Sequence, residues 1–411
     1  MSRVKLKDVC TVIVPMRDKP KEFVDSTKGI PWCRIEDIEG KFLNDSLSHK
    51  YVNETCISQM NLKVFPTGTV LCAVTGASIG KYAITTKELI TNQTFAGIVC
   101  GEKIFNEYLY YFIKQLTNYF INNSVGCAQA YITRESLENL EFDLPPIDTQ
   151  KKIVSILCNL DSKIENNNKT ISELESLAKD IYNYWFLQFE FPNEEGKPYK
   201  SSGGKMVWND ELNREIPEGW KITKLGKLTK CILGGTPSRD NPKYWNGDIN
   251  WINSSKVNEL RISEPSETIT EKGLNESSTS LLPKNTTVLA ITGATLGQIS
   301  ILNIDSCANQ SVIGILENNE LPTVYIYPYI TNSMKGIINN QTGAAQPHVN
   351  KNDIENIYVL LPNCGIMGKY KDKVDGTYTL IMNLCSENLK LSQLRDFLLP
   401  MLMNGQVSFK D

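Results

Sequence analysis

Apolar residues recur at alternating spacings of four and three in the middle of this 411-residue chain and again near its end. This heptad pattern predicts long helices that each bury one stripe of side chains. The first helix is expected over 149–187, about 55 Å long at about 1.5 Å per residue. The second, with a short tail, is expected over 364–411, and Pro400 should end it. The two stripes hold Ile153, Leu157, Leu160, Ile164, Asn167, Ile171, Leu174, Ala178, Ile181 and Trp185, then Ile381, Leu384, Asn388, Leu391 and Leu398.

Two amphipathic helices in one chain most simply bury their stripes against each other. The path of the chain favours an antiparallel coiled coil. Asn167 and Asn388 fall inside the stripes, where a polar group costs stability but disfavours wrong registers. In the alternative arrangement, each helix packs on its own globular domain.

Short apolar stretches outside these helices are bounded by Gly, Asn and Thr, as at 69–74 and 96–100. They indicate strands joined by turns, and a helical stretch follows at 107–113. The pattern predicts two α/β (α+β) domains, at 1–148 and 216–363. A linker rich in charge, Gly and Ser is expected at 188–215.

The two globular regions repeat one another at a constant offset of 217 residues, the distance from Gly76 to Gly293. A match held without a slip over most of each half means two copies of one domain rather than a short motif used twice. The matching segments are Thr75–Gly80 with Thr292–Gly297, Asn92-Gln93 with Asn309-Gln310, and Gly126-x-Ala128-Gln129 with Gly343-x-Ala345-Gln346.

Composition narrows the class of protein. The net charge of −3 argues against a surface that is basic throughout, so nucleic-acid contacts must be local or shared with other subunits. The eleven cysteines form no C-x-x-C pair, and the histidines are His49 and His348, so no metal site is expected. We find no export segment and no run of eighteen apolar residues, and we expect a cytoplasmic protein without membrane contact.

Several elements together resemble the specificity subunit of type I restriction-modification systems. They are the duplicated layout, the Thr-Gly-x-x-x-Gly and Asn-Gln elements, Gly234–Ser238 leading to Asn241–Trp245, Gly196–Gly204, and the closing Leu394–Pro400. The resemblance covers essentially the whole chain.

The resemblance implies a non-catalytic DNA reader with two similar target-recognition domains, each binding one half of a bipartite asymmetric site in double-stranded DNA. The helical pair would set the gap between the half-sites and dock two modification subunits. Those partners would carry S-adenosylmethionine and methylate adenine N6, and restriction subunits would add ATP- and Mg-dependent translocation and cleavage. No cofactor is expected in this chain.

The Gly-Gly-Thr-Pro-Ser element occurs only in the second copy, whereas the first has Val14–Asp18 in roughly that place. The two halves are therefore expected to read different sequences. Base edges are read by side chains with paired donors and acceptors, and phosphates are held by cations and hydroxyls. Candidates of these types flank the expected strands: Arg34, Lys81, Tyr82, Gln129, Tyr131, Thr133 and Arg134 in the first half, and Thr236, Arg239, Lys243, Tyr244, Asn253, Ser254, Lys256, Gln298, Gln346, His348, Asn350 and Lys351 in the second.

Plainer interpretations stand beside these assignments. The Thr-Gly loops lack the Lys-Ser/Thr of a nucleotide P-loop and could be tight structural turns. The Asn-Gln pairs are expected to bond loop backbone rather than bases. Arg134 and Lys351 could be solvated charges at helix starts, and His348 could be buried.

Enzymatic functions find little support. Asn241–Tyr244 is similar to the Asn-Pro-Pro-Tyr of adenine methyltransferases, but it lacks the second proline, and no Gly-rich cofactor loop follows a strand. Paired nucleophiles and bases are also missing. A stand-alone DNA-binding regulator or an interaction scaffold is the competing hypothesis, and it should bind its target without partners.

Overall fold

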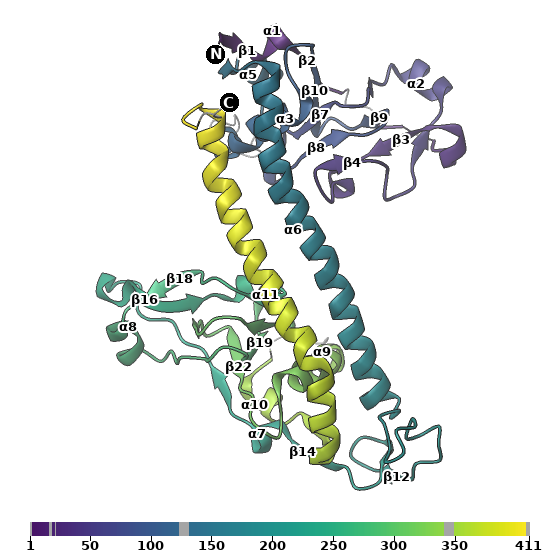
Figure 1. The fold of residues 1–411 in the computed structure, drawn as a ribbon, viewed down its shortest axis with the longest axis vertical. Helices are drawn as coiled ribbons and strands as arrows, with labels where there is room; N and C mark the ends of the chain where they lie inside the picture. Colours follow the sequence, from purple (N-terminus) through teal and green to yellow (C-terminus); the bar gives the residue numbers. More distant parts are fainter. Residues whose placement is uncertain (1, 16–18, 21, 123–130, 341–348, 408–411) are drawn as a thin grey trace. The chain divides into compact units, whose positions relative to one another are not determined.

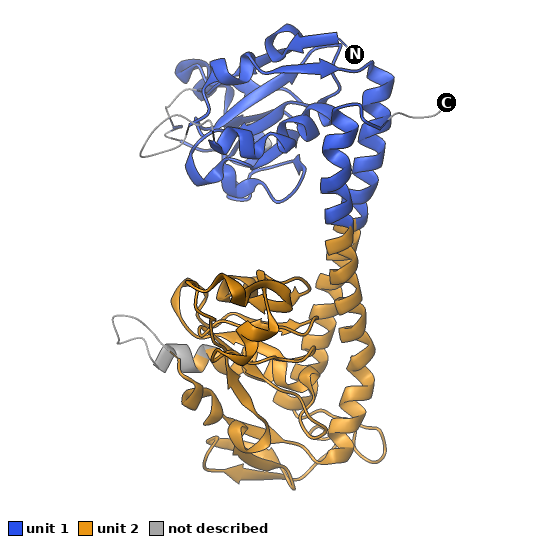
Figure 2. Ribbon diagram, turned by 90° about the vertical axis from the view of Figure 1, so that its left-hand side faces the viewer, with its two compact units in different colours: residues 1–163, 391–411 blue, residues 164–390 orange. Residues whose placement is uncertain are grey.

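The computed structural model describes residues 2–15, 19, 20, 22–122, 131–340 and 349–407. The chain forms two compact units, unit 1 with residues 1–163 and 391–411 and unit 2 with residues 164–390 (Figure 2). Two long helices, α6 (Ile147–Tyr182) and α11 (Cys364–Met403), contribute residues to both units (Figure 1).

The centre of unit 1 is a five-stranded sheet in the order β2-β10-β7-β8-β4. Neighbouring strands run antiparallel except β4 and β8, which are parallel. Helix α3 (Asn106–Gln115) covers the sheet with six consecutive buried residues, 108–113. The strands are β2 (Cys10–Ile13), β4 (Phe42–Leu43), β7 (Val70–Ala73), β8 (Tyr82–Thr85) and β10 (Phe95–Cys100).

A second sheet of unit 1, in the order β5-β3-β9-β6, shares an apolar core with the first. The packing is close, because a Cβ atom on Gly97 would lie 2.1 Å from the ring of Phe65. A third sheet pairs β1 with β11. These elements are β1 (Ser2–Lys5), β3 (Ile30–Cys33), β5 (Tyr51–Val52), β6 (Val64–Phe65), β9 (Leu89–Thr91), β11 (Glu141–Leu144), α1 (Leu6–Val9), α2 (Glu54–Met60), α4 (Thr117–Asn122) and α5 (Arg134–Glu138).

Unit 2 repeats this architecture. Its five-stranded sheet has the order β15-β22-β19-β20-β17, with the same single parallel pair at β17 and β20. The equivalent of the β1–β11 pair is β14–β23, and a three-stranded sheet has the order β18-β16-β21. The repeat confirms two similar α/β domains. The strands are β14 (Lys221–Lys224), β15 (Cys231–Leu233), β16 (Trp245–Ile252), β17 (Arg261–Ile262), β18 (Glu267–Ile269), β19 (Thr287–Ala290), β20 (Ile299–Leu302), β21 (Cys307–Ala308), β22 (Val312–Ile315) and β23 (Tyr358–Leu361), and the helices are α7 (Leu225–Leu228), α8 (Glu271–Asn275), α9 (Thr323–Asn340) and α10 (Lys351–Glu355).

The long helices pair within each unit. In unit 2, Asn167 Nδ2 donates to Asn388 Oδ1 at 2.8 Å, and the rings of Trp185 and Tyr370 lie 5.7 Å apart. The residue numbers rise on α6 while they fall on α11, so the predicted antiparallel pairing is confirmed. In unit 1, the pair is held by Arg395, whose NH1 donates to Asp161 Oδ1 at 2.9 Å.

The stripe residues of both helices are buried or half-buried. Asn167 is 3% exposed, and its Nδ2 also donates to Glu387 Oε2 at 2.7 Å, so the buried amide is satisfied. Ile153 and Leu157 share a core with Leu399 of α11 and with the strands of unit 1. The stripes therefore pack on the partner helix and also on the globular parts, which combines the two arrangements considered above.

The expectation that Pro400 ends the second helix is wrong, because α11 continues to Met403. Pro400 lies in the last turn, where its missing N–H removes only one intrahelical hydrogen bond. The flanking residues Leu399, Leu402 and Met403 are buried in the core of unit 1, and this packing holds the turn.

The segment expected as a linker is folded. Helix α6 passes into a single π-helical turn, Asn183–Leu187, and a hairpin follows with strands β12 (Met206–Asn209) and β13 (Arg214–Pro217). An aromatic cluster fixes the segment to unit 2: the Phe191 ring is stacked 4.6 Å from Tyr199 and 5.1 Å from Trp220.

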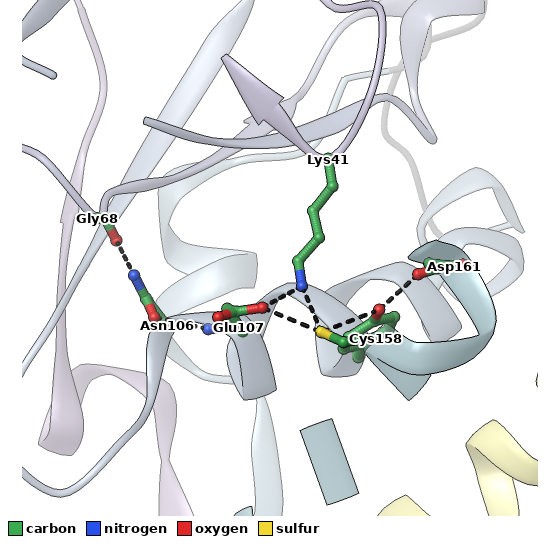
Figure 3. Close-up of polar contacts among 7 residues, drawn as sticks. Lys41, Gly68, Asn106, Glu107, Cys158 and Asp161 are labelled. Carbon is green, nitrogen blue, oxygen red and sulfur yellow. Dashed lines mark hydrogen bonds and ion pairs between the residues drawn. The ribbon is translucent and has the colours of Figure 1, made fainter. Parts of the chain in front are cut away.

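A polar network ties α6 to α3 in unit 1 (Figure 3). Lys41 Nζ is paired with Glu107 and lies 2.8 Å from Cys158 Sγ, which is 3.1 Å from Glu107 Oε2. Tyr111 donates its hydroxyl to Asp161. Burial, and then this hydrogen bond, raise the pKa of Tyr111 above its usual value. Because Asp161 also binds Arg395, the network connects α3, α6 and α11.

Candidate nucleic-acid interface

Two of the duplicated motifs, the Thr-Gly loop and the Asn-Gln turn, meet at one place in each unit. In unit 1, Val74 N donates to Thr94 O at 2.8 Å, and Ile132 N donates to Val74 O at 2.9 Å. A bridge also joins Thr75 to Tyr131. The Thr-Gly loop therefore lies between the Asn-Gln turn and the segment that begins at residue 131.

Unit 2 has the same arrangement. Ile291 N donates to Ser311 O at 2.9 Å, and Val349 N donates to Ile291 O at 3.3 Å. The loops also share their backbone form, with φ of +51° at Gly76 and +70° at Gly293. A Cβ atom at either glycine would meet nothing within 4 Å, so only the left-handed backbone, not crowding, requires glycine there.

The asparagines of the Asn-Gln pairs hold backbone, as expected. Asn92 Oδ1 accepts from Thr94 N at 3.3 Å, and Asn309 Oδ1 accepts from Ser311 N at 3.1 Å. Each therefore closes a local turn of the Asx type. The neighbouring Gln93 and Gln310 are exposed.

Two first-half candidates next to the Thr-Gly loop differ in their exposure. Lys81 is exposed, whereas Tyr82 is 4% exposed and its hydroxyl lies 2.9 Å from Thr117 Oγ1. Burial raises the pKa of Tyr82 above its usual value. The expectation that Tyr82 contacts DNA is contradicted, because its side chain lies in the apolar core of unit 1.

The remaining first-half candidates among the described residues each contact another residue of the protein. Thr133 Oγ1 caps α5 by accepting from Ser136 N at 3.0 Å. Arg134 pairs with Glu138 at 2.7 Å, one turn later on the helix. Tyr131 is half-buried in the bridge to the Thr-Gly loop, and Arg34, at the start of the 3-10 turn Ile35–Asp37, lies 3.8 Å from Glu36. Gln129 lies outside the described residues.

The equivalent places in unit 2 repeat the capping. Asn350 Oδ1 accepts from Asp353 N at 3.0 Å, and Lys351 pairs with Glu355 at 3.4 Å. Arg134 and Lys351 thus lie at helix starts and pair with a carboxylate one turn later, which fits the plainer of the two interpretations. Gln298 is half-buried, and its Oε1 lacks a partner among the described residues. Gln346 and His348 lie outside them.

A 3-10 turn, Ser254–Asn258, carries three further candidates. Asn253 caps it by accepting from Ser255 N at 3.0 Å, and Ser254 is half-buried beside it. Lys256 lies 2.8 Å from Glu259 and 2.8 Å from Glu264, so its charge is neutralised.

The Gly-Gly-Thr-Pro-Ser segment is fixed by two tryptophans. Trp251 Nε1 donates to Gly235 O at 3.1 Å, and Trp245 Nε1 donates to Ser238 O at 3.1 Å. The guanidinium of Arg239 lies 3.7 Å from the centre of the Trp245 ring and donates from both terminal nitrogens to Glu267, at 2.6 and 2.8 Å. Arg239 is therefore held in place before any ligand binds.

Two other candidates of this segment differ in their freedom. Lys243 is exposed, whereas the hydroxyl of Tyr244 donates to Glu276 Oε2 at 2.8 Å. Five cationic candidates thus have an acidic neighbour: Arg34, Arg134, Arg239, Lys256 and Lys351. These five side chains therefore add little uncompensated positive charge to the interface.

Among the described residues, no group of three or more His, Cys, Asp or Glu could hold a metal ion, and no helix is long and apolar enough to cross a membrane.

The fold and the duplicated loop cluster define a class of protein. The family model of the type I restriction modification DNA specificity domain matches residues 1–176 and 217–376, and the chain belongs to this family.

Individual relatives agree with the family. The chain is 28% identical over 390 residues to the type I restriction enzyme MjaIX specificity subunit of Methanocaldococcus jannaschii, covering 93% of this chain and 88% of that protein. It is 24% identical over 383 residues to the HindI specificity subunit of Haemophilus influenzae, covering 80% and 82%. The crystal structure of a type I S subunit from M. genitalium has the same fold, with a TM-score of 0.56, 16% identity, and coverage of 100% of this chain and 96% of that one.

Proposed function

We propose that this chain is the DNA sequence-specificity subunit of a type I restriction-modification complex, and that each half binds one half of a bipartite asymmetric site. The observation that carries the proposal is the same cluster of loops in both units with different side chains at equivalent places. Lys81 in the first half corresponds to Gln298 in the second, and Thr133 to Asn350. One scaffold with two sets of readers fits two different half-sites.

The helical pair is proposed to set the unread gap and to dock two modification subunits. Large apolar side chains on the two helices are exposed, among them Leu177 (50%), Leu380 (44%), Leu394 (45%) and Phe397 (64%). We propose that these side chains contribute to the contact with the modification subunits. We infer that catalysis belongs to the partners. The modification subunits would bind S-adenosylmethionine, and restriction subunits would bind ATP and Mg. This chain would select the DNA sequence at which they act.

A map of methylated adenines in the host genome tests the proposal. With the gene present, we expect methylation at one two-part motif with a fixed gap, and deletion should remove that motif alone. A second test exchanges residues 1–148 for the same region of a relative, which should change one half of the motif. An unchanged map after deletion would contradict the proposal.

A stand-alone DNA-binding regulator is the alternative. Phosphate contacts from Lys and Arg supply most of the affinity of such proteins. Here Arg134, Arg239, Lys256 and Lys351 are each paired with carboxylates, which favours a chain that binds DNA tightly only with partners. Tight, site-specific binding by the purified chain alone would support the regulator instead.

A further inference from the structure

Gln93 and Gln310 are exposed glutamines at equivalent positions in the two units. Each follows an asparagine that closes the turn beside the Thr-Gly loop, so the backbone under each glutamine is fixed by the Asn92 and Asn309 hydrogen bonds. Neither glutamine is needed for the turn itself. Their side chains stand at the point where the duplicated motifs of each unit meet.

The orientation of the Gln310 amide is set by a neighbour. Thr236 Oγ1 lies 2.5 Å from Gln310 Oε1 and donates to it. Thr236 is itself held, because Gly235 N donates to Ala308 O at 2.8 Å and a Cβ atom at Gly235 would lie 2.4 Å from Ser278 Oγ. One acceptor position of the amide oxygen is therefore used, and Nε2 has no hydrogen-bond partner among the described residues.

An amide in this state can donate two hydrogen bonds, whereas one of the two lone pairs of its oxygen is already used by Thr236. Reading adenine requires a donor and an acceptor together, from the two ends of one amide. The bond to Thr236 therefore restricts how Gln310 can turn both ends of its amide toward an adenine, and its free N–H groups suit an oxygen acceptor such as a phosphate.

The duplication supplies a second, independent argument. A residue that is the same in both halves cannot account for a difference between the half-sites, so any DNA contact that it makes is to something that both half-sites share. Gln93 and Gln310 are the same, whereas Lys81 and Gln298 differ at the neighbouring loop. The sugar-phosphate backbone is the part of DNA that is shared whatever the sequence.

We propose that Gln93 and Gln310 are a duplicated pair of DNA phosphate anchors, each donating from Nε2 to a phosphate oxygen of its own half-site. This inference rests on the proposed function. The anchors place each half on the duplex in the same way, and the side chains that differ between the halves then read the bases.

The test uses the complete complex with its modification subunits. Gln310→Ala should weaken binding roughly threefold to tenfold, the value of one or two hydrogen bonds. The loss should be equal on cognate DNA and on DNA with altered half-site bases. Because glutamine is neutral, the dependence of affinity on salt should stay unchanged. Gln310→Glu keeps the shape and the acceptor for Thr236 but opposes a phosphate, so it should bind at least about tenfold more weakly.

Gln93→Ala and Gln93→Glu should act in the same way through the first half-site. Gln188→Ala, an exposed glutamine just beyond α6, is the matched control and should bind like the wild type. Thermal melts of all variants should lie close to that of the wild type, since the replaced side chains are exposed and Gln310→Ala gives up only the exposed hydrogen bond from Thr236.

Two results would overturn the proposal. One is a methylation map of Gln310→Ala in which a base position of the motif is relaxed or changed, since that would make Gln310 a base reader. The other is wild-type affinity for both Gln310→Glu and Gln93→Glu. Failure of the proposed function would give a different result, because the wild-type complex itself would then modify no two-part motif. That result would also contradict the proposal of phosphate anchors.

Discussion

Replacing Glu175 with alanine should destabilise unit 2 strongly, because Glu175 neutralises a buried arginine. The side chain of Arg261, at the start of β17, is 0% exposed and is paired with Glu175 of α6. Its NH1 donates to Leu260 O at 2.7 Å, and its guanidinium lies 4.9 Å from the ring centre of Tyr327 and 5.4 Å from that of Tyr378. The substitution leaves this guanidinium buried without the carboxylate that binds it.

The expected magnitude follows from these contacts. Removing one partner of a buried ion pair costs about 3–5 kcal/mol, because the other charge stays in the interior. The side chain of Glu175 is 23% exposed, so water can reach the vacated position and reduce the penalty. The two rings remain, and cation–π contacts contribute about 0.5–2 kcal/mol. We expect a loss of about 2–4 kcal/mol for Glu175→Ala, and roughly half of that for Glu175→Gln, whose amide oxygen still accepts.

Urea unfolding followed by tryptophan fluorescence measures this loss, because most of the signal comes from unit 2. Five of the six tryptophans belong to that unit: Trp185, Trp208, Trp220, Trp245 and Trp251. Glu173→Ala, exposed two residues earlier on α6, is the control and should change stability by less than about 0.5 kcal/mol. Equal losses for the two alanine variants would refute the reasoning.

Three further outcomes are expected. Tyr82→Phe should cost about 0.5–1.5 kcal/mol, the value of its hydrogen bond to Thr117, and leave the methylated motif unchanged. Seven residues inserted into both long helices at the boundary between the units lengthen each helix by about 10 Å. The unread gap should therefore grow by about 3 base pairs with the half-sites unchanged. An altered half-site with the old gap would contradict the proposal that the helices set the gap. The hydrogen bond from Arg239 lowers the pKa of Glu267, so the pair stabilises above the ordinary glutamate pKa and is lost as pH falls through the lowered value. Between about pH 6 and about pH 3, the wild type should therefore lose more stability than Glu267→Gln, by less than about 1 kcal/mol for this exposed pair.

The duplicated fold could be predicted well from the constant offset of the repeat. Strands and helices follow local sequence patterns, and these patterns occur twice at that offset. The offset also contained a signal that Tyr82 is buried. Its equivalent in the second copy is Ile299, an apolar residue on β20, and a position that accepts either side chain is typical of a core. The folded linker had a comparable signal in the closely spaced aromatic residues Phe186, Phe189 and Phe191.

The contacts of the candidate readers could not be predicted in this way. Arg239 is bound by Glu267, and Thr236 meets Gln310, through strand pairings that bring distant segments together. No local pattern encodes those pairs. The helix caps are easier to predict from the sequence, since Asn350 and Asp353 have the spacing of a capping box.

The places at which the two halves differ support the proposal that different residues hold the phosphates and read the bases. The central sheets have the same strand order, and Trp32 pairs with Ile90 as its counterpart Trp251 pairs with Cys307. The neighbouring strands differ between the halves. Strand β3 has four residues, whereas β16 has eight, and Trp245 of β16 contacts the Gly-Gly-Thr-Pro-Ser segment. A core whose strand order is the same in both halves and a neighbouring strand that differs between them can be altered separately. The second half can therefore change the bases that it reads while its proposed phosphate anchor and its helix stay in place.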